Sequence, residues 1–197
     1  MSLQTRAVNI LKQPKAEWPV IAAETTDVAT LYKEYIAPLA AIPVIAGFIG
    51  LTMVGVSVPF FGTYRVSITT GLTNCIVQYV LALVGVYVAA IVIEQLAPKF
   101  ESRGSTIQAL KLVAYASTPV WVAGVFNLIP ALSVLTIVAA LYAIYLFYLG
   151  LPVMMNTPES KVLPFMVVAA IVIFVINLIV AFVTASISGV GQRPVIG

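Results

Sequence analysis

Residues 109–153 read ALKLVAYASTPVWVAGVFNLIPALSVLTIVAALYAIYLFYLGLPV, an apolar run with a single charged residue, Lys111. About 20 apolar residues suffice for a helix to cross the roughly 30 Å hydrocarbon core of a bilayer. The 45 residues of 109–153 are therefore too many for one crossing. Proline is favoured in the first turn of a helix, where its missing N–H costs nothing. We predict a tight hairpin of two spanning helices, in which Asn127 caps the first helix and Pro130 opens the second.

Further apolar runs of this length lie on either side of the hairpin. The five predicted membrane-spanning helices occupy about residues 36–56, 72–93, 109–129, 131–153 and 162–187. The composition agrees, because 61% of the residues are hydrophobic, 9% are charged and the mean hydropathy is +1.09. Soluble domains have about 45–50% apolar and about 25% charged residues, and a chain of 197 residues cannot bury such an excess. We therefore predict an all-α, polytopic transmembrane helical bundle.

These spans divide the chain into an N-terminal segment at 1–34, a five-span domain at 35–190 and a short tail at 191–197. The first segment lacks the apolar core of a cleavable signal peptide. Eight basic residues fall on one side of the predicted spans, namely Arg6, Lys12, Lys15, Lys33, Lys99, Arg103, Lys111 and Lys161, against Arg65 and Arg193 on the other. Because cytoplasmic loops are enriched in Lys and Arg, we expect a cytoplasmic N-terminus and a C-terminus outside.

The N-terminal segment predicts a short basic amphipathic helix over residues 2–12. Its apolar residues recur at helical spacing and form one face, made of Leu3, Ala7, Ile10 and Leu11, while Arg6 lies away from that face. A helix of this kind beside a membrane commonly lies in the interface. Pro14 ends the helix.

The segment between this helix and the first span carries two further signals. Trp18, next to Pro19, is a residue type that favours the lipid headgroup layer. Thr26 followed by Asp27 predicts a helix N-cap with an acidic residue in the first turn. We expect the helix that starts there to continue into the first span, with Pro38 and Pro43 as kink points.

The composition also excludes several kinds of chemistry. The chain has no histidine and one cysteine, Cys75, so Ser-His and Cys-His couples, disulfides and His-ligated metal sites cannot form within it. Its seven acidic residues all lie outside the middle of the apolar runs, which argues against paired catalytic carboxylates. We predict no catalytic, cofactor-binding or metal-binding residues. A formal charge of +3, scattered along the chain, does not suggest nucleic acid as a partner.

Amide side chains are the main polar groups in the predicted spans. Asn74 and Gln78 lie four residues apart on one face of the second span, Asn127 ends the third, and Asn177 lies in the fifth. Such residues commonly form helix–helix contacts, where amides bond across the interface. They can also line an aqueous path through the membrane. Both interpretations stay open at this point.

Two other groups have alternative interpretations. Glu94 ends the second span and Lys111 begins the third, so they either form an ion pair or extend separately into water. Tyrosines 142, 145 and 148 recur every three residues on the fourth span, shortly before Gly150 and Pro152. They are typical of interfacial belts or bundle packing, and the alternative is a ligand site.

The region from Ala114 to Met154 resembles the Yip family of five-span membrane proteins, named for interaction with Ypt/Rab GTPases, and its bacterial members in particular. The resembling residues are Ala114 to Pro119 (AYASTP), Trp121, Asn127 to Pro130, Tyr142, Tyr145 and Tyr148 to Pro152 (YLGLP), together with Pro14 to Pro19 (PKAEWP) near the start. The resemblance implies five spans and a cytoplasmic N-terminus. Eukaryotic members are linked to vesicle traffic through Rab binding and membrane shaping, but the N-terminal segment here is only about 34 residues long.

The sequence therefore predicts a non-enzymatic protein of the bacterial cytoplasmic (inner) membrane that organises the membrane or binds a protein partner. The candidate residues for this role are Glu94, Lys111, Tyr115, Pro119, Asn127, Pro130, Tyr148, Gly150, Pro152, Asn74, Gln78 and Asn177. Its partners would include the lipid bilayer and a further copy of the chain. The alternative is an oligomeric channel or facilitator for a small solute, ion or lipid.

Overall fold

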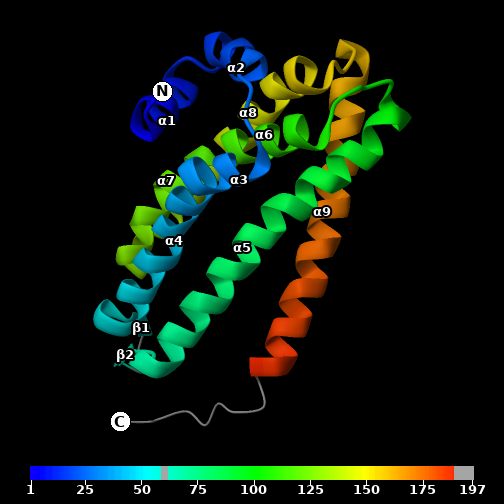
Figure 1. The fold of residues 1–197 in the computed structure, drawn as a ribbon. Coiled ribbons are helices and arrows are strands. Elements are labelled where there is room, and N and C mark those ends of the chain that lie inside the picture. The colour runs from blue at the N-terminus through cyan, green and yellow to red at the C-terminus, as the bar shows by residue number, and fades with distance from the viewer. Residues whose placement is uncertain (59–61, 189–197) are drawn as a thin grey trace.

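A computed structural model describes residues 1–58 and 62–188, without the side chains of residues 176, 177 and 179–188. The described chain is almost entirely helical and confirms the all-α prediction (Figure 1). Within the described residues, four helical stretches are long and apolar enough to cross a membrane: Val28–Val54, Ile68–Phe100, Thr106–Leu128 and Leu135–Met155. They correspond to the first four predicted spans. The fifth predicted span lies in a further long helix, and its crossing of the membrane stays a prediction.

Two short helices precede the first span. α1 (Leu3–Lys12) begins where the Ser2 hydroxyl accepts a hydrogen bond from the Thr5 N–H, which confirms the predicted N-terminal helix. α2 (Pro14–Ala23) was not expected as a helix and starts with proline in its first turn. The two helices pack against each other, and α2 also packs against the fourth span. We call α1 and α2 together the cap.

The first span combines α3 (Val28–Leu31), the π-helical turn η1 (Tyr32–Ile36), α4 (Ala37–Ile49) and a second π-helical turn, η2 (Gly50–Val54). Asp27 rather than Thr26 is its N-cap, because the Asp27 carboxylate accepts hydrogen bonds from both the N–H and the hydroxyl of Thr30, at 2.9 and 2.8 Å. These two bonds hold the pKa of Asp27 below its ordinary value. η1 ends two residues before Pro38, as expected for an irregularity close to a helical proline.

A short hairpin, which the sequence analysis did not predict, follows the first span. Its strands are β1 (Val56–Val58) and β2 (Gly62–Tyr64), and they pair antiparallel. Gly55 lies directly before β1 with a φ of 81°, a backbone conformation that glycine adopts without strain. This β-hairpin, which we call the hairpin from here on, lies at the opposite end of the molecule from the cap (Figure 1).

The remaining spans are joined by short connections. The second consists of α5 (Ile68–Leu96) and the 3-10 turn η3 (Ala97–Phe100), and the third of α6 (Thr106–Ala116), α7 (Thr118–Ala123) and the 3-10 turn η4 (Gly124–Leu128). After η5 (Pro130–Leu132), the fourth span is α8 (Leu135–Met155), and α9 (Glu159–Ser188) follows. Pro130 therefore opens a separate 3-10 turn, and the helix of the fourth span begins four residues later than predicted.

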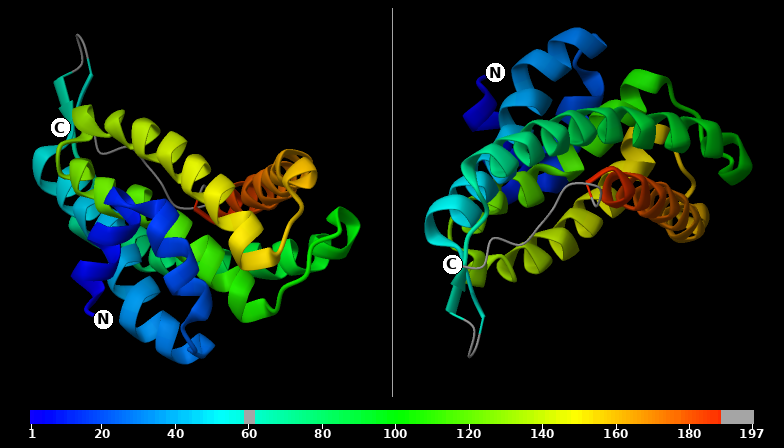
Figure 2. Two further views of the ribbon diagram at one scale, coloured as in Figure 1. Left: turned by 90° about the horizontal axis from the view of Figure 1, so that it is seen from above. Right: turned by 90° about the horizontal axis from the view of Figure 1, so that it is seen from below.

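The third span is the centre of the bundle. α6 packs against α5 and α8, and α7 packs against α4 and α8 (Figure 2). α9 lies beside α5 and α8 and runs from the cap end of the molecule to the hairpin end (Figure 1). The largest fully buried side chains gather where the cap covers α6 and α8, and they include Ile10, Trp18, Ile21, Leu112 and Met155. The cap therefore covers a large part of the buried apolar core.

Candidate functional site

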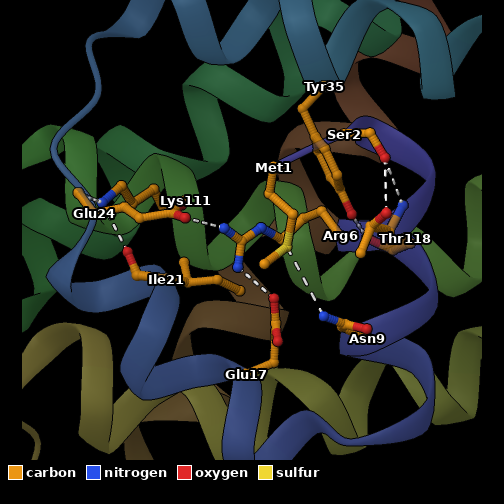
Figure 3. Close-up of polar contacts among 11 residues, drawn as sticks. Met1, Ser2, Arg6, Asn9, Glu17, Ile21, Glu24, Tyr35, Lys111 and Thr118 are labelled. Carbon is orange, nitrogen blue, oxygen red and sulfur yellow. Dashed lines mark hydrogen bonds and ion pairs between the residues drawn. The ribbon is translucent and has the colours of Figure 1, made fainter.

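Arg6 of α1 is held inside the cap by two carboxylates. One guanidinium nitrogen donates to Glu17 and the other to Glu24, so the side chain ties α1 to both ends of α2 (Figure 3). The side chains of Arg6 and Glu17 are 5% and 8% exposed, whereas that of Glu24 is 42% exposed. Although the sequence places Arg6 away from the apolar face of α1, its side chain is buried, because Glu17 and Glu24 supply both counter-charges.

Lys111, in α6 of the third span, binds the same end of the cap. It is 2% exposed, and its ammonium group donates to the backbone carbonyls of Ile21, at 2.9 Å, and Glu24. These carbonyls lie at the C-terminal end of α2, where the helix dipole favours a cation. With two acids and two bases, the ionic cluster of Arg6, Glu17, Glu24 and Lys111 carries no net formal charge.

Glu94 and Lys111 have different partners, so neither alternative stated for them describes the structure. The Glu94 carboxylate accepts a hydrogen bond of 2.7 Å from the Thr106 hydroxyl and so joins the end of α5 to the start of α6. Lys111 faces the cap, where it satisfies carbonyl groups that α2 itself leaves without partners. Its burial also excludes the interpretation that it extends into water.

Aromatic and hydroxyl groups surround the ionic cluster. The Arg6 guanidinium lies 5.9 Å from the centre of the Tyr115 ring, within the range of a cation–π contact. The Tyr115 ring packs in turn against Tyr35, at 4.4 Å between ring centres. Thr118 donates to the Tyr115 carbonyl and lies 2.7 Å from the Tyr35 hydroxyl, which can therefore donate to it. Pro119, which follows in α7, is also buried.

Trp18 fills a space that Gly150 leaves open. Its side chain is 0% exposed, so it packs inside the protein, and its predicted position at the depth of the headgroup layer stays a prediction. A Cβ atom at Gly150 would lie 2.6 Å from two indole carbons of Trp18 and 2.7 Å from Leu112. The indole also meets the Tyr115 ring edge-on, at 6.5 Å between ring centres. Gly150, predicted as a candidate, therefore has a specific role: it lets the cap pack onto α8.

The other predicted residues of the fourth span, and Asn177 of the fifth, lie away from the ionic cluster or outside the described side chains. Tyr142 donates a hydrogen bond of 2.7 Å to the carbonyl of Leu11, at the end of α1. Tyr148 is 46% exposed, and Pro152 is half-buried within α8. The side chain of Asn177, in α9, lies outside the described residues.

The remaining predicted amides meet at the other end of the bundle, around a cavity of about 470 Å³ that we call the polar cavity. Asn74, Gln78, Asn127 and Pro130 are among the residues that line it. Asn127 lies within η4 and does not cap the third span as predicted. Its side-chain amide donates instead to the carbonyl of Pro43, at 3.4 Å. This hydrogen bond joins the end of the third span to the first span.

The comparison with protein families agrees with this arrangement. The family model described as "Yip1 domain" matches residues 8–182. This chain belongs to the Yip1 family. The match includes Glu17, Trp18, Lys111, Tyr115 and Gly150, so almost the whole contact between the cap and the spans lies within the Yip1 domain.

Two relatives of this Yip1 protein are both described as "Inner membrane protein YohC". They come from Escherichia coli strain K12 and from Escherichia coli O6:H1 strain CFT073. Each is 30% identical over 188 residues, which cover 93% of this chain and 96% of the relative. No solved structure matches the chain. Together with the apolar spans, the similarity to these relatives shows that the chain is an integral membrane protein.

The sequence analysis missed four residues of this site: Arg6, Glu17, Glu24 and Trp18. A signal for the carboxylates was present, because Glu17 and Glu24 are seven residues apart and so share one face of a helix. Recognising it required α2 to be predicted as a helix, and Pro14 and Pro19 obscured that. Among the described residues, no three His, Cys, Asp or Glu side chains lie together as metal ligands.

Proposed function

We propose that this Yip1 protein is a non-enzymatic, membrane-organising protein of the bacterial cytoplasmic membrane, and that it binds a protein partner through its cap. The proposal includes a cytoplasmic cap and a fifth span in α9. The observation that supports it best is the ionic cluster. Because Arg6 and Lys111 lock α1 and α2 onto the third span, the outer surface of the cap is presented in one fixed orientation. A preorganised surface of this kind loses little entropy on binding.

The outer surface of the cap has the chemistry of a docking site for an acidic protein segment. Lys12 and Lys15 are exposed, and among the described residues neither takes part in an ion pair. Glu17 in α2 and Glu24 at its C-cap, by contrast, form ion pairs with Arg6. Val8 and Val20 are 46% and 43% exposed on the same cap. Basic groups beside exposed apolar side chains suit a partner that offers carboxylates and an apolar contact.

Photo-crosslinking in native membranes tests this proposal. A photoreactive residue replaces Val8 or Ala16, both exposed on the cap, and in a control it replaces Tyr64, which is 53% exposed on the hairpin. We expect a discrete protein adduct from the cap positions, and its loss when Lys12→Glu and Lys15→Glu are combined. Adducts with lipid alone, or a protein adduct that survives the charge reversal, would refute the proposal.

Deleting the N-terminal segment would be a poor test of the same idea. Residues 2–18 include Arg6, Ile10, Glu17 and Trp18, all of which are buried against the spans. Their removal would expose the core of the bundle and leave the Glu24 carboxylate without Arg6. Loss of an interaction in that variant would therefore not separate binding from folding.

The polar cavity favours a second candidate function, that of a facilitator for a small solute, ion or lipid. Three of the four predicted amides line this cavity, as expected for a polar path rather than for isolated packing contacts. Flux into liposomes containing the purified protein, compared with empty vesicles, tests it. The variant Asn74→Leu should reduce flux, and unchanged flux would exclude that residue from any path.

A further inference from the structure

A second cavity adjoins the polar cavity, and we call it the apolar cavity. It is an open cavity of about 800 Å³ between α5, the third span, α8 and α9. Both cavities are lined by Gln78, so they meet at this residue of α5. α5 and α9 lie close together near η3 and diverge toward the hairpin end (Figure 1). Volumes of about 300–1,000 Å³ are typical of sites that hold a small molecule.

The polar cavity offers neutral hydrogen-bonding groups. Among the described residues, the amides of Asn74 and Gln78 have no hydrogen-bond partner, whereas the Ser133 hydroxyl already donates to Pro130. No Asp, Glu, Lys or Arg is among the described residues that line this cavity. Amide N–H groups of this kind suit uncharged acceptors such as ester carbonyls, because unpaired amides in an apolar environment cost free energy.

The apolar cavity offers almost no polar group beyond Gln78. The Ser117 hydroxyl lines it but donates to the carbonyl of Val113, at 2.8 Å. Apolar cavities stay dry, so an aqueous path would stop at Gln78. The cavity follows α5 from Gln78 to Ala89, and 11 residues of helix at about 1.5 Å each span about 16 Å. That is close to half of the roughly 30 Å hydrocarbon core, the depth of one acyl chain.

We propose that the two cavities together bind one membrane glycerolipid. The ester carbonyls of the lipid accept hydrogen bonds from Asn74 and Gln78, and one of its acyl chains occupies the apolar cavity. The charged headgroup extends past the polar cavity toward the hairpin end of the bundle. This inference does not depend on the function of the cap. It deepens the second candidate function, because it names the molecule that the cavity of a facilitator would take.

The test uses purified full-length protein in lipid nanodiscs that contain phosphatidylethanolamine with a photoreactive diazirine on one acyl chain. We expect labelled peptides from α5 and α8 at the apolar cavity. Gly85→Leu should abolish this labelling, because the cavity is open at Gly85 and a Cβ there meets nothing within 4 Å. The matched control is Val80→Phe, which adds bulk to α5 at a 52% exposed position outside both cavities.

A second variant tests the polar half of the site. Combining Asn74→Leu with Gln78→Leu removes both amides at exposed positions and should weaken lipid retention about tenfold, as expected for two lost hydrogen bonds. Unlabelled phosphatidylethanolamine should compete with the probe, and free palmitic acid should compete much less. Equal competition by the fatty acid would overturn the assignment of a glycerolipid.

The remaining outcomes also decide the proposal. Labelling spread evenly over all lipid-facing helices, and unchanged in Gly85→Leu, would show ordinary surrounding lipid and refute the site. Circular dichroism of each variant checks that it is folded, and competition on the wild-type protein needs no variant. Lipid binding without flux would leave the site intact and reject the facilitator function. Flux without specific labelling would support the facilitator function and refute the lipid site.

Discussion

The contact between Trp18 and Gly150 gives the sharpest test of the cap. In Gly150→Ala, the new methyl group would lie 2.6 Å from the Trp18 indole and 2.7 Å from Leu112. Carbon atoms pack best at about 3.5–4.0 Å, so the indole must move by about 1 Å. Trp18 is fully buried, which leaves it little room to do so. The replacement should therefore strain the packing of α2 against α8.

The size of the effect depends on two opposing contributions. Overpacking a core costs about 1–3 kcal/mol, while replacing glycine with alanine inside a helix returns about 0.5–1 kcal/mol. We expect Gly150→Ala to lower the free energy of unfolding by about 0.5–2 kcal/mol. The control is Gly47→Ala in α4, where a Cβ meets nothing within 4 Å. That variant should keep or slightly raise stability.

A double-mutant cycle identifies the contact responsible. Trp18→Leu removes both indole carbons that the new methyl group would meet, at a cost in stability of its own. In that background, Gly150→Ala should cost nothing or restore stability, so the coupling between the two positions should reach about 1–3 kcal/mol. Unfolding in mixed micelles with increasing sodium dodecyl sulfate, followed by far-ultraviolet circular dichroism, measures all four proteins. Equal costs of Gly150→Ala in both backgrounds would refute the packing argument.

Three further predictions concern charges and hydrogen bonds. Arg6→Ala leaves the Glu17 carboxylate buried and unpaired, so the free energy of unfolding in the same assay should fall by about 3–5 kcal/mol, and Arg6→Lys should recover only part of it. Tyr142→Phe loses a hydrogen bond to the end of α1 and should cost about 0.5–1.5 kcal/mol, whereas Tyr145→Phe, at a 42% exposed position, should cost nothing measurable. Because the pKa of Asp27 is lowered by the hydrogen bonds it accepts, its charge stabilises the fold fully above the ordinary pKa, about 3.9, and less as pH falls through the folded value. The difference in melting temperature between wild type and Asp27→Asn should therefore shrink on acidification, and a difference independent of pH would contradict this.

The spanning helices could be predicted because their signal is local. An apolar run long enough to cross the bilayer must satisfy its own backbone, and a helix does this without help from distant residues. The second and third spans accordingly begin within about four residues of the predicted positions, at Ile68 and Thr106. The fourth begins late because Pro130 opens a separate turn, η5, before α8. Proline marked the boundary correctly but did not determine whether a 3-10 turn or an α-helix begins there.

The site was harder to predict because its contacts join distant parts of the chain. Arg6 meets Glu24 only because the chain turns at Gln13, and Lys111 meets the end of α2 across 90 residues of sequence. A helical wheel of residues 2–12 alone places Arg6 outside the apolar face and gives no sign of its two carboxylate partners. Part of the polar cavity, by contrast, could be predicted from local sequence spacing. Asn74 and Gln78 share a face through local spacing, so their joint placement could be predicted, although the approach of Asn127 could not.

The ionic cluster specifies the position of the cap more than it stabilises the protein. Removing two charges from water costs about as much as their attraction returns, so a buried pair such as Arg6 and Glu17 adds little net stability. Any arrangement of α1 that separates the two leaves an unpaired buried charge, which is strongly unfavourable. The apolar contacts of Ile10 and Trp18 can supply the free energy of docking, but apolar contacts tolerate small changes in register. The charges restrict the cap to one register, and the proposed docking of a partner at Lys12 and Lys15 depends on that restriction.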